Sequence, residues 1–254
     1  MTNQKNTSSD PIERLYELLL EAREIVRTTN QPNAQQLVVW TKIFGSKSSD
    51  IHSNTYLTRS RAFIDLIERS ENQVRKFEGV NLDIYLRPFK EVNKLIPYLY
   101  KPNAKQGMFN SIITGAVMNG LEYAVDQSKR QYPEPEKFEY SRLKEIGDEV
   151  ISLRNEILES NLPQSLKEVL VRNLHKIDEA ISLFFLKGIE GIDDALSSNW
   201  GILFRTVRQV SATEGGVNVA QRILKILNDI ETIFSLDDRI GLSDLVVKMI
   251  GDGS

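Results

Sequence analysis

Hydrophobic residues recur at steps of three and four between residues 140 and 209, and charged residues fill many of the positions between them. This spacing places the apolar side chains on one stripe of a helix and the charged side chains on the other side. Because only a few residues separate the segments, we expect three amphipathic helices packed side by side and antiparallel. The predicted buried stripes are Leu143, Ile146, Val150, Leu153 and Ile157, then Leu166, Leu170, Leu174, Ile177, Ile181 and Phe184 or Phe185, then Ile192, Leu196, Trp200, Leu203 and Val207.

Start and stop signals separate these three helices. Pro163 suits the first turn of the second helix, and Ser165 precedes Glu168 by three residues, the spacing of a capping box. Gly188 is predicted to end this helix, because glycine adopts the positive φ that often terminates helices. Acidic residues begin the third helix and arginines end it, an order that complements the helix dipole.

The same periodicity predicts helices in the first half of the chain. Residues 70–73 are polar on all sides, so the long helix that contains them is expected to extend past the body of the protein. Residues 80–86 alternate like a strand, but a lone strand has no partner, and a short helix broken by Pro88 is favoured. The expected helices span residues 10–26, 32–44, 55–77, 89–96 and 108–125, with an exposed loop over 46–54.

The segment from Met108 to Val125 is apolar around most of a helix and contains Gly115 and Gly120. Glycines permit close approach to another backbone. The favoured interpretation is a helix at the centre of the N-terminal bundle. The alternative is a segment that meets a partner protein, a second copy of the chain or a membrane after a conformational change.

A boundary is predicted at residues 129–137, where two prolines lie among charges. The chain is therefore divided into an N-terminal helical region (1–128), a Pro/charged linker (129–137) and a C-terminal helical bundle (138–254), and packing as one domain stays open. The last bundle helices are expected near 220–234 and, capped by Ser243, at the end of the chain. The predicted fold is all-α, an irregular multi-helix bundle of about eight to ten helices, on the usual helix and loop lengths.

Composition excludes several classes of function. The 254 residues are 41% hydrophobic and 26% charged, as in ordinary globular proteins. The absence of cysteine excludes disulfides and thiolate chemistry and fits a reducing compartment. The sequence offers no apolar run long enough for a signal peptide or a membrane span, so a cytoplasmic protein is expected. A net charge of −3 argues against general nucleic-acid binding.

Candidate chemistry is sparse. His175 shares a helix side with Asp178 and Glu179, a spacing that a metal ion can use, but the favoured interpretation is a solvated face with an intrahelical ion pair. Arg172 and His175 are too close in sequence for the arginine-to-histidine spacing of HEPN ribonucleases. Residues 45–48 lack the first glycine of a phosphate loop. No catalytic, cofactor-binding or metal-ligating residue is therefore predicted, and no cofactor or small-molecule ligand is expected.

The run LRNEILESNLPQSLKEVLVRNLHKIDEAISLFFLKGIEGIDDAL resembles a helical segment of uncharacterised bacterial proteins, over about residues 140–205. The shared features are a helix that ends before a Leu-Pro pair, a long amphipathic helix and a third helix bounded by glycine. No established activity comes with this family. The resemblance implies genes found among bacterial mobile elements and antiviral defence systems.

Taken together, these patterns predict a non-catalytic helical subunit that binds a protein partner or assembles as a homo-oligomer, in a bacterial defence or toxin-control system. The alternative is a membrane-perturbing or self-assembling effector that uses Met108–Val125. Tryptophan and arginine are enriched at binding hot spots, and the competing explanation is a buried tryptophan with a helix-terminal arginine pair. The candidate interface residues are Trp200, Phe204, Arg205 and Arg208.

Overall fold

The structure, a computed structural model, describes residues 8–29, 35–45, 52–101, 103–133, 140–198, 200–213 and 215–234. Within these ranges every regular element is a helix, apart from one isolated bridge between Gln35 and Lys105, which confirms the all-α prediction. The chain forms two compact units. Unit 1 comprises Met1–Lys137 with Phe185–Gly188, and unit 2 comprises Phe138–Phe184 with Ile189–Ser254.

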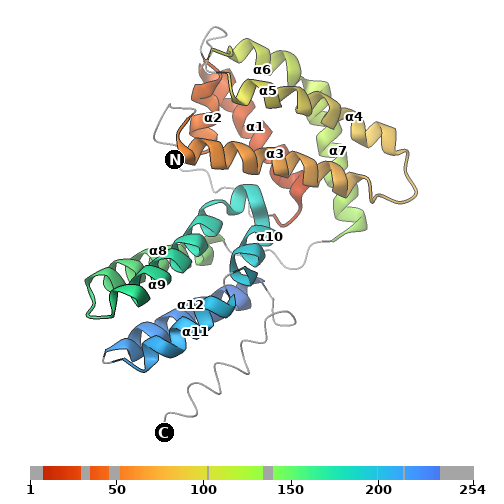
Figure 1. The fold of residues 1–254 in the computed structure, drawn as a ribbon. Helices are drawn as coiled ribbons and strands as arrows, with labels where there is room; N and C mark the ends of the chain where they lie inside the picture. The colour runs from red at the N-terminus through yellow and green to blue at the C-terminus, as the bar shows by residue number, and fades with distance from the viewer. Residues whose placement is uncertain are drawn as a thin grey trace. The chain divides into compact units, whose positions relative to one another are not determined.

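Unit 1 is arranged around its first helix, which contacts α2, α3, α6 and α7 (Figure 1). The predicted start is confirmed, since the Asp10 carboxylate accepts a hydrogen bond of 2.7 Å from the amide of Ile12. The predicted apolar stripe of α1 is buried along its whole length. The helices of unit 1 are α1 (Pro11–Thr29), α2 (Leu37–Ile43), α3 (Asn54–Val74), α4 (Leu82–Val92), the 3-10 helix η1 (Asn93–Leu95), α5 (Ile96–Leu99), α6 (Gln106–Ile112) and α7 (Gly115–Gln131).

An aromatic cluster fills part of the core of unit 1. The fully buried ring of Trp40 lies 5.6 Å from Phe44, 5.0 Å from Phe63 and 6.1 Å from Phe109, measured between ring centroids. Tyr56 packs on Phe44 and donates a hydrogen bond of 2.8 Å to the carbonyl of Leu99. Each such ring pair adds about 0.5–1.5 kcal/mol beyond the burial of its area. The cluster therefore fastens α2, α3 and α6 to one another.

The second helix is shorter than its pattern predicts. The expected start at residue 32 lies outside the described residues, and α2 itself begins at Leu37. Gln36 instead donates its amide to the carbonyl of Ala104 at 2.6 Å, beside the bridge between Gln35 and Lys105. The predicted end is confirmed, because Gly45 has a φ of 58°. Most of the expected loop, residues 46–51, lies outside the described residues.

The polar middle of the long third helix does not leave the body of the protein, so that prediction is wrong. Ser70 is fully buried, and its hydroxyl donates to the carbonyl of Leu66 or of Pro11, at 2.7 and 2.8 Å. Val74 is also fully buried. The hydroxyl has a single proton and can donate it to either carbonyl, so this buried group has a hydrogen-bond partner, as polar groups in a core require. The residues in this turn are polar, but the side chain of Ser70 lies in the interior of unit 1.

Residues 82–92 form one helix, as favoured over a strand, but Pro88 does not break it. A proline inside a helix removes a backbone hydrogen bond and normally kinks or ends it. Here the ring packs against α7 at Gly120, where a β-carbon would lie only 2.8 Å from Pro88 Cγ. The close approach allowed by glycine replaces part of the lost bonding with contact between α4 and α7. This confirms the role expected of Gly120.

The apolar segment 108–125 is two helices, which corrects the prediction of one. Ile113, at ψ 71°, leaves the helical conformation, and the hydroxyl of Thr114 accepts from the amide of Val117 to start α7. Gly115 then occupies the first turn, and an added β-carbon would meet only an arginine side chain at 3.9 Å. The apolar side chains are buried in unit 1, as favoured, at Phe109, Ile112, Ile113, Val117, Met118, Leu121, Ala124 and Val125. Among the described residues, no helix is long and apolar enough to cross a bilayer.

Unit 2 is a ring of four helices around an aliphatic core. Each of α8, α9, α11 and α12 contacts two of the others, in the order α8, α9, α11, α12 and back to α8 (Figure 1). The predicted stripe of α8 is buried at all five positions. The helices are α8 (Tyr140–Glu159), α9 (Gln164–Ser182), α10 (Phe184–Ser197), α11 (Trp200–Ser211) and α12 (Gly216–Phe234).

Three details of this part of the chain differ from the predictions. The capping box is absent, because Pro163 is the N-cap of α9 and has no side-chain hydrogen bond. The carboxylate of Glu168 instead accepts a hydrogen bond of 3.1 Å from the side-chain amide of Gln164. The second helix ends at Ser182, before Gly188. The expected third helix is divided into α10 and α11. The turn at 237–241 and the last helix capped by Ser243 lie outside the described residues.

Residues Phe185–Gly188, which belong to unit 1, are bound by Arg69 and lie beside Arg14. Arg69 donates to the carbonyls of Lys187 at 2.6 Å and Leu186 at 2.8 Å. Gly188 has a φ of 67°, and a β-carbon on it would lie 2.3 Å from Nη1 of Arg14. That guanidinium is fully buried and donates to the carbonyls of residues 8 and 9. The predicted positive φ of Gly188 is therefore confirmed, but within α10.

Candidate functional site

Helix α11, which carries the four predicted interface residues, has two different sides. Its inner side packs against α9 and α12 through Leu203, Val207 and Val210, which are at most 2% exposed. On the outer side Ile202 is 53% exposed, and Arg205 and Arg208 are also exposed. Residues three apart lie on the same side of a helix. We call Ile202, Phe204, Arg205 and Arg208 the α11 surface.

The structure places the predicted residues as follows. Arg205 and Arg208 stand on the exposed side of α11, and Phe204 is half-buried at its edge. The side chain of Trp200 lies outside the described residues, so its part in the interface stays a prediction. Ile202 was not predicted. Its signal was present in the sequence, because it lies one turn before Arg205 and off the apolar stripe.

The charge of the α11 surface is unbalanced. The helix, WGILFRTVRQVS, contains two arginines and no acidic residue. Among the described residues no ion pair involves Arg205 or Arg208, whereas Arg222 pairs with Glu149 at 2.7 Å and also with Glu156. Within the described part of the chain, both guanidinium groups are therefore without an ion-pair partner and lie exposed beside Ile202.

The chemistry of this surface suits binding of an acidic protein surface. A guanidinium presents five N–H donors in a planar fork that fits a carboxylate with two parallel hydrogen bonds. Arginine and aromatic residues are enriched at protein interfaces, and apolar contacts at the centre of a patch exclude water from the polar ones. The α11 surface supplies both kinds of contact within three turns of one helix.

His175, which sequence analysis weighed as a metal ligand, belongs to a network of polar and charged side chains between α8 and α9. Nη1 of Arg154, on α8, donates to the carboxylate of Asp178 at 3.0 Å and lies 3.3 Å from Nδ1 of His175, both on α9. Arginine has no acceptor, so the contact with His175 is a hydrogen bond when Nδ1 carries the lone pair. The expected ion pair was intrahelical, and the structure corrects this to a pair across the α8–α9 seam. Among the described residues, no group of three or more His, Asp or Glu side chains could hold a metal ion.

A groove of about 280 Å³ lies between α8 and α12. Two basic and three acidic side chains alternate around it, so it presents no single charge to a ligand. One of the acids, Glu149, is already paired with Arg222. The groove is lined by Arg142, Glu145, Ile146, Glu149, Lys225, Ile226, Asp229 and Ile233. This arrangement resembles the seam of two packed helices more than a site for chemistry.

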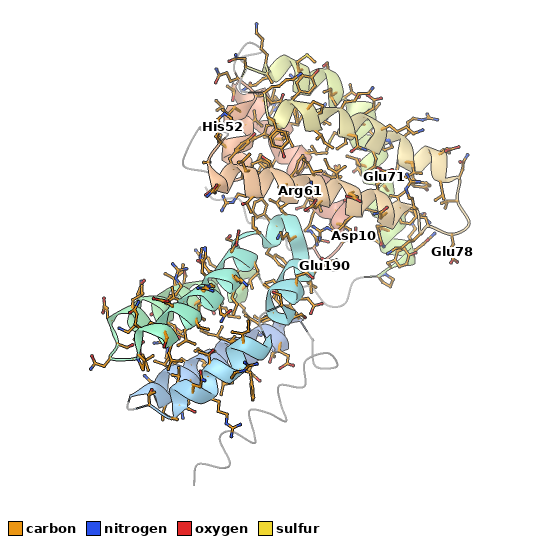
Figure 2. The ribbon with its side chains drawn as sticks, viewed as in Figure 1. Asp10, His52, Arg61, Glu71, Glu78 and Glu190 are labelled. Atoms are coloured by element: carbon orange, nitrogen blue, oxygen red, sulfur yellow. The ribbon has the colours of Figure 1, made fainter. Side chains whose placement is uncertain are left out.

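Titratable residues in unit 1 are spread rather than gathered. Figure 2 shows His52 just before α3, Arg61 and Glu71 along the helix, and Glu78 in the loop after it. Arg61 pairs with Asp65 at 3.0 Å, and Glu71 pairs with Arg75, each within the helix. The backbone of Glu78 exchanges two hydrogen bonds with the side chain of Gln131 on α7, which fastens the loop. These contacts stabilise the fold and bring no two catalytic groups together.

Buried hydroxyl and guanidinium groups in unit 1 titrate far from neutral pH. Burial raises the pKa of Tyr56 to about 12, although the neighbouring Ser60 hydroxyl acts in the opposite direction and Tyr100 adds to the rise. Burial lowers the pKa of Arg59, which donates to the carbonyl of Phe44. Neither group is poised for proton transfer near pH 7.

Sequence analysis missed three buried polar side chains in unit 1. Gln36, Trp40 and Gln106 are fully buried, and among the described residues neither the two side-chain amides nor the indole N–H has a hydrogen-bond partner. A buried polar group without a partner costs about 1–3 kcal/mol, against a total stability of about 5–15 kcal/mol for a typical protein. Glutamine is usually a surface residue, so the local sequence does not predict this burial.

No family model matches the chain, and no match was found among the curated proteins or the solved structures compared with it. The resemblance of residues 140–205 to bacterial helical proteins stays a hypothesis.

Proposed function

We propose that the protein is a non-catalytic interaction or regulatory subunit that binds an acidic surface of a partner protein through its α11 surface. The observation that carries this proposal is the pair of exposed, unpaired arginines beside Ile202 on a helix without acidic residues. The resemblance in residues 140–205 supports a setting in bacterial defence or toxin control.

Two other arginines of unit 2 lie at the seams between helices and differ from the arginines of the α11 surface. Arg154 and Arg222 each bind carboxylates of a neighbouring helix, with side chains about one quarter exposed. Their role is internal to the bundle. Arg205 and Arg208 have no such role, and their helix is already anchored by Leu203 and its inner side. Changing them should therefore affect binding and leave the fold intact.

The alternative effector has a requirement that the proposed interaction does not share. An effector that uses Met108–Val125 would have to expose side chains that form the core of unit 1. Burial of a single large apolar side chain stabilises a fold by about 1.5–3 kcal/mol. Binding through α11 needs no such opening.

The experiment is purification of the tagged full chain from its native host, with mass spectrometry of co-purifying proteins and light scattering of the isolated chain. The double variant Arg205→Glu/Arg208→Glu is compared with the control Arg172→Glu/Lys176→Glu, which makes the same change of charge on exposed positions of α9. We expect a stoichiometric partner with the native chain and the control, and its loss with the α11 variant. Equal recovery with both variants would refute the role of α11, and a monomer without any partner would refute the function.

A further inference from the structure

Two glutamines and one tryptophan are fully buried in the core of unit 1. Gln36 precedes Trp40 by one helical turn, and Gln106 precedes Phe109 by one turn. The rings of Trp40 and Phe109 are in contact, with centroids 6.1 Å apart. This contact joins α2 to α6, and we call the part of the core around these four residues the layer.

An isolated bridge brings the two segments together beside these side chains. Gln35 and Lys105 form the bridge and are exposed, whereas their neighbours Gln36, Ala104 and Gln106 are buried. Gln36 is the N-cap of α2, and Gln106 is the first residue of α6. The bridge therefore joins the starts of the two helices, where both buried glutamines lie.

Among the described residues, none of the five side-chain polar atoms of these three residues has a hydrogen-bond partner. They are Oε1 and Nε2 of Gln36, Oε1 and Nε2 of Gln106, and Nε1 of Trp40. The hydrogen bond between Gln36 and Ala104 joins their backbones and leaves these side-chain atoms without a partner. Buried polar groups are almost always hydrogen-bonded, to protein or to internal water.

The chemistry of the layer restricts its occupant to a small molecule. The two carbonyl oxygens need donors, and the two NH₂ groups and the indole N–H need acceptors. A nucleobase or another flat ligand would require an open ring face, but Phe44 stacks on Trp40, and Phe63 and Phe109 also pack against it. Water offers donors and acceptors in the smallest volume.

We propose that Gln36, Trp40 and Gln106 form an internal water-binding site that joins α2 to α6. A water in this layer donates to an amide oxygen and accepts from the indole N–H or from a second amide. It completes hydrogen bonds that the two short helices cannot complete alone. The site is independent of the α11 surface.

The first test is a high-resolution crystal structure of the full chain, with nuclear magnetic resonance of the Trp40 indole proton. We expect a water oxygen within hydrogen-bond distance of at least two of the three side chains, and magnetisation transfer between that indole proton and a long-lived water. A direct hydrogen bond between Gln36 and Gln106 with no water in the layer would overturn the proposal. An organic molecule in the layer would also overturn it.

The second test measures whether the two amides act together. Gln36→Met and Gln106→Met remove polar atoms while keeping the length of the side chain. We expect each single variant to lower the melting temperature and the double variant to lower it by clearly less than the sum, because the water and its unmet bonds leave together. The control Gln209→Met, at an exposed position, should leave it unchanged. Additive losses would overturn the proposal.

Discussion

The two units differ in how their cores are stabilised. Unit 2 is a ring of helices with an almost wholly aliphatic core, in which Phe184 and Phe234 form an aromatic pair. Its charges pair across the helix seams. Unit 1 has an aromatic cluster around Trp40 and contains the fully buried polar side chains Gln36, Ser70 and Gln106. Close fits that require glycine occur in both units, at Gly120 and Gly188 in unit 1 and at Gly216 in unit 2. Regular periodicity accounts for most of the core of unit 2, whereas the core of unit 1 also depends on contacts between individual aromatic and polar side chains.

This difference predicts which substitutions are tolerated. A change that adds one carbon to a close fit in unit 1 should destabilise it, whereas the same change on an open helix of unit 2 should be neutral or favourable. Removing an ion pair of unit 2 is predicted to cost little stability, because these ion pairs are partly exposed to solvent and are screened by salt.

The largest effect is expected for Gly188→Ala. Gly188 has φ 67° and ψ −157°, a conformation essentially restricted to glycine, and the new methyl group would collide with the Arg14 guanidinium. That group is fastened by its hydrogen bonds and cannot readily move aside. We expect a loss of about 3 kcal/mol in the free energy of unfolding, measured by urea denaturation. An unchanged midpoint would show that this close fit does not stabilise unit 1.

The next effect is a loss of stability in alkali that originates in unit 1. Tyr56 has a folded-state pKa of about 12 against an ordinary tyrosine pKa of 10.0, so the unfolded chain releases this proton first. The stabilisation is complete below pH 10, falls as the pH rises and is lost by pH 12. It amounts to about 2–3 kcal/mol. Denaturation between these pH values should show the decline, and Tyr56→Phe should remove it while costing about 1 kcal/mol at pH 7 for the lost hydrogen bond to Leu99.

Contacts between residues far apart in the sequence show most clearly which features the local sequence cannot predict. The stripe of α8 could be predicted because its five apolar residues need only a neighbouring helix. The tolerance of Pro88 within α4 could not be predicted in this way, since it depends on Gly120 in another helix. The burial of Ser70 depends likewise on the carbonyl of Pro11, at a separation of 59 residues. Local patterns predict elements, and close contacts between distant elements decide the exceptions.

The candidate site shows the same limit. Arg205 and Arg208 were predicted from residue type, and the structure adds that they are exposed and that Ile202 lies beside them. The separation of α10 from α11 was missed, because no glycine or proline marks residues 198–199. Gln36 and Gln106 were missed because nothing in their local sequence distinguishes them from surface glutamines.

A matched pair of glycine substitutions compares the two units directly. Gly120→Ala in unit 1 places a β-carbon 2.8 Å from Pro88, whereas Gly201→Ala on α11 meets nothing within 4 Å. We expect the first to destabilise by about 1–2 kcal/mol through overpacking and the second to stabilise by about 0.5–1 kcal/mol through helix propensity. Thermal unfolding distinguishes the two, and equal shifts would contradict the proposed difference between the units.

The smallest effect is expected at the seam of α8 and α12. Arg222→Met removes the ion pairs with Glu149 and Glu156 but keeps the apolar stem of the side chain. We expect a loss of about 0.5–1 kcal/mol at low salt. It should shrink in about 1 M sodium chloride, where charges are screened within about 3 Å. A loss that is large and independent of salt would mean that this seam, too, is a close fit.

The central claim is that the α11 surface binds a partner and contributes little to the fold. The most direct measurement is quantitative mass spectrometry of proteins that co-purify with Arg205→Glu/Arg208→Glu and with the control Arg172→Glu/Lys176→Glu, both verified to be folded by circular dichroism. The account predicts that a stoichiometric partner is lost from the α11 variant and retained by the control. Retention of the same partner by both variants, or loss from both, would contradict it.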